Sequence, residues 1–333
     1  MPEIRQNMAT KEWVIIATAR AKRPSEFVAR AKDLTADRAE RESSCPFCPG
    51  NEEPELEILR IPDTGSWKVR VVRNKYPALD TGGNRVRSFD GVHRAITGVG
   101  HHEVLIESRR HNTCPALESP EDVALMLRTF QGRGRAMAED PRVDHVILFK
   151  NHGTGAGTSL VHPHTQIIGL PIVPHDIRGR LEEARRYCDD TGRCVFCQMC
   201  ADELADGRRM VAESEMFVAF VPYAAPSPFH MWAVPRRHES DFLKARPEEL
   251  ADLGRILRQV LRKIYFGLND PDYNYVVRTA PLHDAGQEYL HWYVTIIPRV
   301  TKAAGFELGS GMFINIALPE DSAEFLRSVR EPE

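Results

Sequence analysis

The stretch Gly153–Pro171, GTGAGTSLVHPHTQIIGLP, joins a glycine-rich segment to two histidines and a short apolar run. Side chains alternate between the two faces of an extended chain, so His162 and His164 are expected to point to one side and share a site. Pro163 suits the start or edge of a strand because it lacks a backbone donor. The glycines leave room for backbone N–H groups to approach an anion closely. The stretch therefore predicts an imidazole beside a phosphate-binding loop; the simpler interpretation is two hydrogen-bonded strand histidines.

Length and composition limit the classes of protein that remain. A chain of 333 residues can form two domains or one two-fold repeated unit. Its 44 Lys and Arg against 47 Asp and Glu argue against a nucleic-acid partner. No run approaches the ~20 apolar residues of a membrane span, and the opening MPEIRQNMATKEW lacks the apolar region of a signal peptide. We expect a cytoplasmic protein with no membrane partner.

Hydrophobic patterning predicts a mixed α+β chain. Helices are expected to begin at Pro120 and Pro247, each with acidic residues in the first turn. Residues 80–97 are rich in glycine and charge and are predicted to be a loop. Short apolar or alternating runs predict strands at 11–18, 67–73, 102–106, 144–150 and through His162, then at 217–221, 231–234, 273–278 and 291–298.

The two halves of the chain repeat the same order of features. Each has Cys-x-x-Cys, a strand followed by Arg-Arg-His, a proline-initiated helix, a strand, a loop and a strand that begins with histidine. From His111 to Pro120 is nine residues, and from His238 to Pro247 is also nine. From each proline to the next repeated histidine is 42 and 44 residues. This agreement predicts an internal duplication.

The repeated residue types are two cysteines and two histidines in each half. Two thiolates and two imidazoles form the closed tetrahedral set of a structural zinc site, and a reducing cytosol favours metal over disulfides. An isolated Cys-x-x-Cys would be weak evidence, but its occurrence twice with matched histidines strengthens the prediction. Cys114, Cys188 and Cys200 have no counterparts and are expected to be free thiols. The two predicted zinc sites are Cys45, Cys48, His111 and His162, and Cys194, Cys197, His238 and His291.

The differences between the halves indicate which one carries chemistry. His164 corresponds to Tyr293, and Gln166 corresponds to Thr295. The glycine-rich loop is present only in the first half. If His162 binds zinc, His164 is the candidate nucleophile, and the second half is predicted to be degenerate.

The residues His162, Pro163, His164 and Gln166, with Asn151 and Ser159 upstream, resemble the galactose-1-phosphate uridylyltransferase family. That family is the transferase branch of the histidine-triad superfamily and has two such repeats per chain. The resemblance covers essentially the whole chain. It includes Arg20–Pro24, Cys45–Cys48, Asn74, His111 and Gly305–Glu307.

The resemblance implies a fold and an assembly. It implies two tandem histidine-triad-like domains, residues 1–175 with the His-Pro-His-x-Gln motif and residues 176–333 in degenerate form. Each would be a mainly antiparallel sheet with packed helices, and the two sheets are expected to join across a pseudo-two-fold. A homodimer is expected.

The resemblance also implies a mechanism with nucleotide sugar and sugar 1-phosphate, or phosphate, as partners. His164 would attack the α-phosphorus and form a covalent nucleotidyl-histidine, which a second phosphate acceptor then attacks. Gln166 would hydrogen-bond the phosphoryl oxygens, and Ser159 with the loop N–H groups would stabilise developing charge. The other implied residues are Arg23, Asn74 and Asn151 as nucleotide contacts, and Lys302 and Glu307 at the sugar phosphate in a dimer partner's site.

Departures from the best-known uridylyltransferases leave the substrate open. Thr165 stands where those enzymes have glycine, and the segment before His162 reads SLV. The leading hypothesis is a UDP-glucose–hexose-1-phosphate (galactose-1-phosphate) uridylyltransferase. The complete second metal set and the tail are more similar to ADP-glucose:phosphate adenylyltransferase, a phosphorylase, which is the alternative; a hydrolytic variant is also possible. A non-catalytic zinc-stabilised nucleotide-binding module is the alternative of another class, and His164 and Gln166 argue against it. Base, sugar, acceptor, oligomeric state and the identity of the second metal, zinc or iron, stay open.

Overall fold

A ten-stranded antiparallel sheet forms the centre of the computed structural model, which describes residues 2–18, 22–28 and 33–332. Among these described residues no helix has the length and apolar character needed to cross a bilayer. The strands, in spatial order, are β10 (Met210–Glu213), β11 (Phe217–Phe220), β12 (Met231–Pro235), β14 (Tyr293–Pro298), β13 (Tyr273–Arg278), β8 (His145–His152), β9 (His164–Leu170), β7 (His101–Ile106), β4 (Val69–Arg73) and β3 (Glu57–Ile61).

The two halves of the chain meet where β8 pairs with β13. Outward from this pair, the first half contributes β8, β9, β7, β4 and β3, and the second contributes β13, β14, β12, β11 and β10. The register sets Phe149 opposite Val276 and Asn151 opposite Asn274. The α+β class and the joining of two sheets across a pseudo-two-fold are confirmed.

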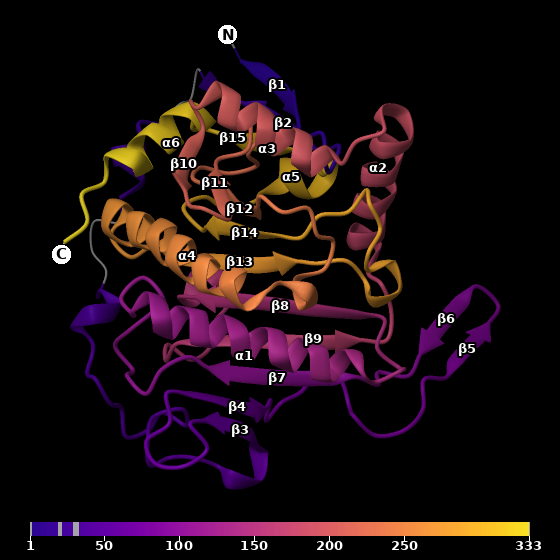
Figure 1. Cartoon of the computed structure of the whole chain (residues 1–333), viewed down its shortest axis with the longest axis vertical. Coiled ribbons are helices and arrows are strands. Elements are labelled where there is room, and N and C mark those ends of the chain that lie inside the picture. Colours follow the sequence, from indigo (N-terminus) through magenta and orange to yellow (C-terminus); the bar gives the residue numbers. More distant parts are fainter. Residues whose placement is uncertain (1, 19–21, 29–32, 333) are drawn as a thin grey trace.

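Two long helices, α1 (Pro120–Ala138) and α4 (Pro247–Leu268), cover one face of the sheet (Figure 1). Both begin at the predicted prolines, and the Ser119 side chain caps α1 by accepting from the Asp122 N–H. The helices cross closely at Gly254, where an added Cβ would lie 2.9 Å from the Ala124 Cβ. Their apolar stripes enclose the main core with the strand residues of that face.

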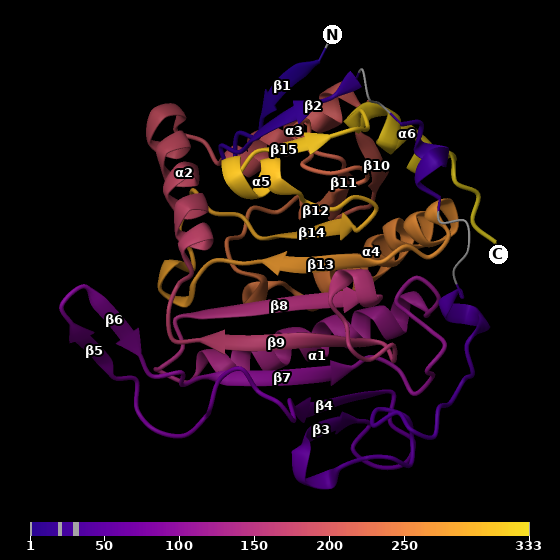
Figure 2. The same ribbon diagram turned by 180° about the vertical axis from the view of Figure 1, so that it is seen from behind.

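The opposite face carries smaller elements (Figure 2). A three-stranded sheet lies over the second half, and α2 stands at the side of the sheet. The elements are β1 (Glu3–Gln6), β2 (Trp13–Ile16) and β15 (Phe313–Asn315), with α2 (His175–Thr191), α3 (Val195–Asp206) and α5 (Gly305–Ser310). Helix α6 (Pro319–Ser328) instead packs against α4 and β10, where its buried residues join the main core. None of these helices was predicted from the sequence; of these strands only β2 was.

The prediction of a loop over residues 80–97 is wrong in part. Strands β5 (Arg87–Asp90) and β6 (His93–Ile96) form an exposed hairpin that stands out from the body of the molecule (Figure 1). Gly91 and Val92 form the two-residue turn, and Gly91 has the positive φ of 56° that hairpin turns require. Composition concealed the hairpin because its strands are polar and bury almost nothing.

Candidate active site and metal centres

A pocket on the sheet face opposite α1 collects four of the predicted functional residues. His164 and Gln166 project into it from β9, Asn74 follows β4, and Ser159 lies on the loop before β9. Val72, Val104 and Ile106 form its apolar floor. The space is about 1270 Å³, part of it open to solvent, which is enough for a nucleotide sugar.

The His164 side chain is buried and its ring is held in one orientation. Its Nδ1 lies 2.8 Å from the carbonyl oxygen of His162. A carbonyl only accepts, so Nδ1 carries the proton, and the neutral ring has its lone pair on Nε2. Burial lowers the pKa of His164 to about 4, which keeps the ring neutral at physiological pH. The lone pair on Nε2 is what a nucleophilic imidazole needs.

A second histidine, His102 on β7, fixes the direction of the Gln166 amide. The Ala78 N–H donates to His102 Nδ1 at 3.1 Å, so the proton of this neutral ring is on Nε2. That Nε2 lies 2.9 Å from Gln166 Oε1 and 3.0 Å from Asn74 Nδ2. Because the Asn74 amide nitrogen is itself a donor, only the glutamine oxygen can accept the Nε2 proton. With its oxygen engaged, Gln166 retains both amide protons as donors beside His164.

A buried ion pair lies behind the His164 backbone. Lys150 Nζ is 2.8 Å from both carboxylate oxygens of Glu107 and 3.1 Å from the carbonyl oxygen of His164. Lys150 and Glu107 are both almost fully buried. The ammonium thus connects β8, β7 and the start of β9 at the residue that carries the candidate nucleophile.

The first predicted metal group comes together. Donor atoms of Cys45, Cys48, His111 and His162 all lie within 4.8 Å of one another, and all four residues are buried. Cys48 Sγ is 3.6 Å from His111 Nδ1 and 3.5 Å from His162 Nδ1. Tetrahedral zinc, with bonds of ~2.3 Å to sulfur and ~2.0 Å to nitrogen, separates such atoms by about 3.5 Å. The donor set therefore fits a four-coordinate metal ion.

The second group has the same geometry in the other half. Cys197 Sγ lies 3.3 Å from His238 Nδ1 and 3.4 Å from His291 Nδ1, and Cys194 completes the set. This group is more exposed, and its Cys-x-x-Cys lies at the start of helix α3.

In both groups a backbone carbonyl holds one ring with Nδ1 toward the sulfur. Ser108 O lies 2.8 Å from Nε2 of His162, and Pro235 O lies 3.0 Å from Nε2 of His291. Such contacts fix the tautomer that a ligating histidine needs. Two possible metal sites are therefore present.

His162 and His164 belong to different sites. The strand begins only at His164, so His162 precedes it. The ring of Phe47, inside the first Cys-x-x-Cys, contacts both histidines edge-on, with centroids 6.1 Å and 5.4 Å away. The expectation of one shared site is replaced by two adjoining ones.

Four predicted substrate-binding residues do not line this pocket. Asn151 on β8 accepts a hydrogen bond from the Asn274 amide at 2.8 Å. Arg23 is exposed at the start of a short 3-10 turn, and its neighbours Arg20 and Ala21 lie outside the described residues. Lys302 and Glu307 line a separate pocket in the second half.

The glycine-rich loop already contacts an anion of the chain itself. The Gly155 N–H donates to Asp272 Oδ2 at 2.6 Å, and a Cβ at Gly153 would come within 2.0 Å of that carboxylate. Gly153 and Gly157 have φ of 82° and 93°. Glycine lets the backbone come close to an anion, and at Gly155 that anion is the Asp272 carboxylate of the chain itself.

Sequence reasoning missed several residues around His164. Arg70, Arg73 and Lys75 line the pocket, Arg70 paired with Glu57 and Lys75 with Glu53, and Tyr76, 83% exposed, lies at its rim. His102 was missed because only the strand register sets it against Gln166. Lys150 and Glu107 could have been predicted from the sequence, since each is a charged residue at the end of an apolar strand.

Comparison with known proteins follows this geometry. Residues 1–174 match the family model described as galactose-1-phosphate uridyl transferase, N-terminal domain. The ADP-glucose phosphorylase of Arabidopsis thaliana is 36% identical over 98% of this chain and 93% of its own length. The galactose-1-phosphate uridylyltransferase of Thermotoga maritima is 28% identical over 98% of both chains. A crystal structure of an Arabidopsis thaliana ADP-glucose phosphorylase with bound ADP-glucose superimposes with a TM-score of 0.83, at 34% identity, over 99% of both chains.

The fold, the pocket with its buried histidine and these relatives define the class: the protein is a nucleotidyltransferase. It belongs to the galactose-1-phosphate uridylyltransferase family.

Proposed function

We propose that the enzyme transfers a nucleoside monophosphate from a nucleotide sugar to a phosphate-bearing acceptor through a covalent bond to His164. The observation that carries this proposal is the orientation of His164. Its Nδ1 proton is engaged by the His162 carbonyl, and the ring lies in a pocket lined by the Gln166 amide and three cationic side chains. Two of these cations are ion-paired, Arg70 with Glu57 and Lys75 with Glu53, and the third is Arg73. This arrangement provides a neutral nucleophile beside groups that stabilise phosphoryl oxygens.

The two chemical steps follow from that arrangement. The lone pair of His164 Nε2 forms a bond to the α-phosphorus, and the bond from phosphorus to the bridging oxygen breaks, releasing sugar 1-phosphate. A phosphate oxygen of the acceptor then attacks the same phosphorus, and the N–P bond breaks, returning its electron pair to Nε2. Gln166 donates to a phosphoryl oxygen in both steps, and Ser159 lies on the loop at the pocket wall.

Two substrate pairs are candidates. The first is UDP-glucose with a hexose 1-phosphate, such as galactose 1-phosphate. The second is ADP-glucose with phosphate as acceptor, as in a phosphorylase. The complete second Cys and His group and the 36% identity to an ADP-glucose phosphorylase, against 28% to a uridylyltransferase, favour the second pair.

Zinc is the metal we propose for both groups, because two sulfur and two nitrogen donors in closed tetrahedral spacing are typical of structural zinc. It would tie the Cys45–Cys48 turn and the Cys194–Cys197 turn to the sheet, and it takes no part in the transfer. Many cysteine thiols and no disulfide among the described residues agree with the proposed cytoplasmic location.

We also propose two repeat domains, residues 1–175 and 176–333, and a homodimer. Lys302 and Glu307 line a pocket that does not include His164, so they serve an active site only if it belongs to a second copy. Arg23 and Asn151, which also lie outside the His164 pocket, remain proposed nucleotide contacts. Mixing His164→Gly with Lys302→Ala chains tests the dimer: mixed dimers would regain one complete site, whereas each variant alone would be inactive. No regain after subunit exchange would refute shared sites.

Intact-mass measurement after incubation with UDP-glucose and ADP-glucose, separately, tests the function. Gain of a UMP or AMP mass on the wild-type chain is expected from one of the two, and it identifies the base. Release of that mass by phosphate, but not by galactose 1-phosphate, would identify the phosphorylase reaction. No adduct with either nucleotide sugar would refute the covalent mechanism.

A further inference from the structure

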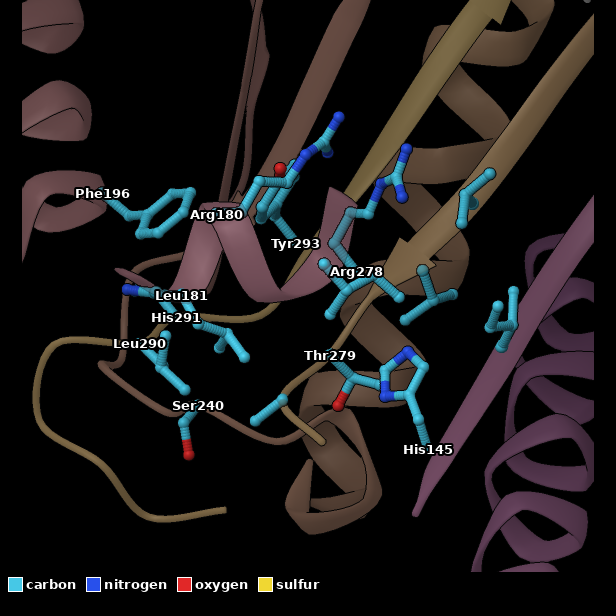
Figure 3. Close-up of a pocket in the computed structure, with 15 residues that line it drawn as sticks. His145, Arg180, Leu181, Phe196, Ser240, Arg278, Thr279, Leu290, His291 and Tyr293 are labelled. Atoms are coloured by element: carbon cyan, nitrogen blue, oxygen red, sulfur yellow. The ribbon is translucent and has the colours of Figure 1, made fainter. Parts of the chain in front are cut away.

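Two hollows of the second half meet at a pair of arginines. One is mostly apolar and is drawn in Figure 3; the other is more polar and lies next to it. Arg180 of α2 and Arg278 of β13 line both. Figure 3 shows their guanidinium groups extending in the same direction, with Tyr293 beside Arg180.

Within the part of the chain that the structure describes, neither arginine of this partly buried pair has the close carboxylate partner that the buried arginines of this chain have. Among the described residues, Arg278 has no ion pair, and its buried Nε has no hydrogen-bond partner. The nearest carboxylate to Arg180 is Glu12, at 3.7 Å and 39% exposed. Elsewhere this chain places an acid at 2.8 Å from its buried arginines, as for Arg70 with Glu57 and Arg209 with Glu203.

The electrostatic consequence is a positive pocket. Its polar hollow is lined by four cationic side chains, Arg180, Arg278, Arg299 and Lys302, against the two carboxylates Glu12 and Glu307. Burial and the neighbouring Arg180 both lower the pKa of Arg278, which means that its charge is disfavoured as the structure stands. An anion between the two guanidinium groups would remove that cost.

Two buried histidines leave further polar atoms in these walls without partners. His145 on β8 is 3% exposed and lines the apolar hollow, and its Nδ1 has no hydrogen-bond partner in the described part of the chain. Figure 3 shows its ring directed toward Thr279. His230 is 8% exposed and lines the polar hollow, and no residue within 2–18, 22–28 or 33–332 hydrogen-bonds its Nδ1. Unpartnered buried polar atoms on both sides of the arginines point to a ligand with polar groups.

The polar hollow corresponds by the internal repeat to the His164 pocket. His230 Nε2 lies 2.8 Å from Thr295 Oγ1, as His102 Nε2 lies 2.9 Å from Gln166 Oε1 in the first half. Trp232 is paired with Thr295, as Val104 is paired with Gln166. Tyr293 replaces the nucleophile, so this second pocket can bind but cannot form the histidine adduct.

We propose that Arg180 and Arg278 form a second, non-reactive site that binds the phosphate group of a small phosphorylated ligand. Each planar guanidinium offers paired N–H donors that match phosphate oxygens, and two of them balance a dianion. The apolar hollow beside them accepts the uncharged part of the ligand. Lys302 and Glu307 of the same hollow are proposed above to serve a partner's active site, whereas Arg180 and Arg278 belong to no site assigned so far. The site they form does not depend on the histidine adduct and goes beyond the proposed function.

Calorimetric titration of the His164→Gly chain tests the site, because that variant cannot trap a nucleotide covalently. The probes are inorganic phosphate, glucose 1-phosphate and AMP, each titrated alone. Binding of at least one is expected, and Arg278→Gln and Arg180→Gln, each added to this chain, should weaken it at least tenfold. Arg178→Gln, two residues away on the exposed side of α2, should leave it unchanged.

Three further results separate this site from the active sites. Binding that survives Arg278→Gln and Arg180→Gln but is lost in Lys302→Ala would assign the ligand to a partner's active site and overturn the proposal. Absence of binding by all three probes would overturn it as well. Single Arg278→Gln and Arg180→Gln chains should still form the His164 adduct, so a failed nucleotide transfer in the wild type would not be confused with a failed second site.

Discussion

His102 Nε2 lies 2.9 Å from Gln166 Oε1, and this contact sets which end of the glutamine amide faces the substrate pocket. The backbone N–H of Ala78 determines the tautomer of His102, and the tautomer determines the orientation of Gln166. A main-chain donor outside the motif thus controls a side chain inside it. The amide protons of Gln166 are thereby kept available for phosphoryl oxygens.

Gln166→Glu tests this orientation without changing the size of the side chain. One carboxylate oxygen would still accept from His102, but the other would present negative charge where the wild type presents N–H donors. The rate of adduct formation should fall by at least about 100-fold, the usual effect of losing a donor to a developing anion. Single-turnover mass spectrometry measures it, with Gln166→Asn as the neutral control. Equal rates for Gln166→Glu and wild type would contradict the assigned direction of the amide.

His164→Gly should retain fold and metal but form no nucleotide adduct. The side chain contributes the attacking nitrogen, whereas His162 and the three other donors of the first metal group are untouched. Added nucleoside 5′-phosphorimidazolide should partly restore transfer, because only the attacking imidazole is missing. Metal content and intact mass are the measurements. An adduct on this variant would place the nucleophile elsewhere.

Lys150→Met should destabilise the protein by about 3–5 kcal/mol, because it leaves the Glu107 carboxylate buried without its partner. Adding Glu107→Gln should recover much of that free energy of unfolding. The double variant still lacks the ammonium on the His164 carbonyl, so its adduct formation should stay slower than that of the wild type. Urea unfolding and single-turnover rates separate the two effects. A Lys150→Met chain as stable as the wild type would show that the ion pair is not buried as described.

Cys194→Ala should lower the metal content from two zinc ions per chain to one and reduce thermal stability, with the His164 adduct still forming. The second metal group holds α3 against the sheet near β12 and β14. Strands β13 and β8 separate this part of the sheet from β9. Elemental analysis and thermal unfolding measure the first two effects. One zinc or none in freshly purified wild type would refute the two-zinc assignment, and a folded variant without turnover would refute the purely structural role.

Asp270 should make stability depend on acid pH. Burial alone would raise the pKa of Asp270, but hydrogen bonds from His152 and Thr35 outweigh burial and lower it from 3.8 to about 2. A depressed carboxyl pKa stabilises the fold above the unfolded pKa, here by about 2 kcal/mol, and the contribution is lost as pH falls through about 4 to 2.

Comparison of the wild type with Asp270→Asn at pH 6 and pH 3 checks that dependence. The difference in free energy of unfolding between the two proteins should shrink by about half at pH 3. Taking the difference removes the acid sensitivity of the metal groups, which both proteins share. A difference that grows at pH 3 would reverse the sign and contradict the low pKa of Asp270.

The internal duplication allowed much of this fold to be predicted from sequence. Two strand–helix–strand series with matched Cys and His spacing predicted α1, α4, the inner strands and both metal groups. The polar hairpin β5–β6 and helices α2 and α3 were not predicted. Their sequences are charged or mixed, and their positions depend on packing against the second half.

Site residues that belong to a sequence motif could be predicted. Residues that reach the site only because of the pairing register between strands could not. His164 and Gln166 follow from His-Pro-His-x-Gln. His102 reaches Gln166 only because β7 pairs antiparallel with β9, and that alignment is set by the whole sheet. Asn151 was expected in the pocket but lies toward β13, where it pairs with Asn274.

The pairing of β8 with β13 has a consequence for any attempt to divide the chain. Each strand is the outermost strand of its own half, and the backbone hydrogen-bonding groups along its outer edge are satisfied by the other half. Expressed alone, residues 1–175 or 176–333 would present a long, apolar, open strand edge, which is a template for aggregation. The two fragments should therefore be recovered in useful yield only when they are produced together and associate through that seam.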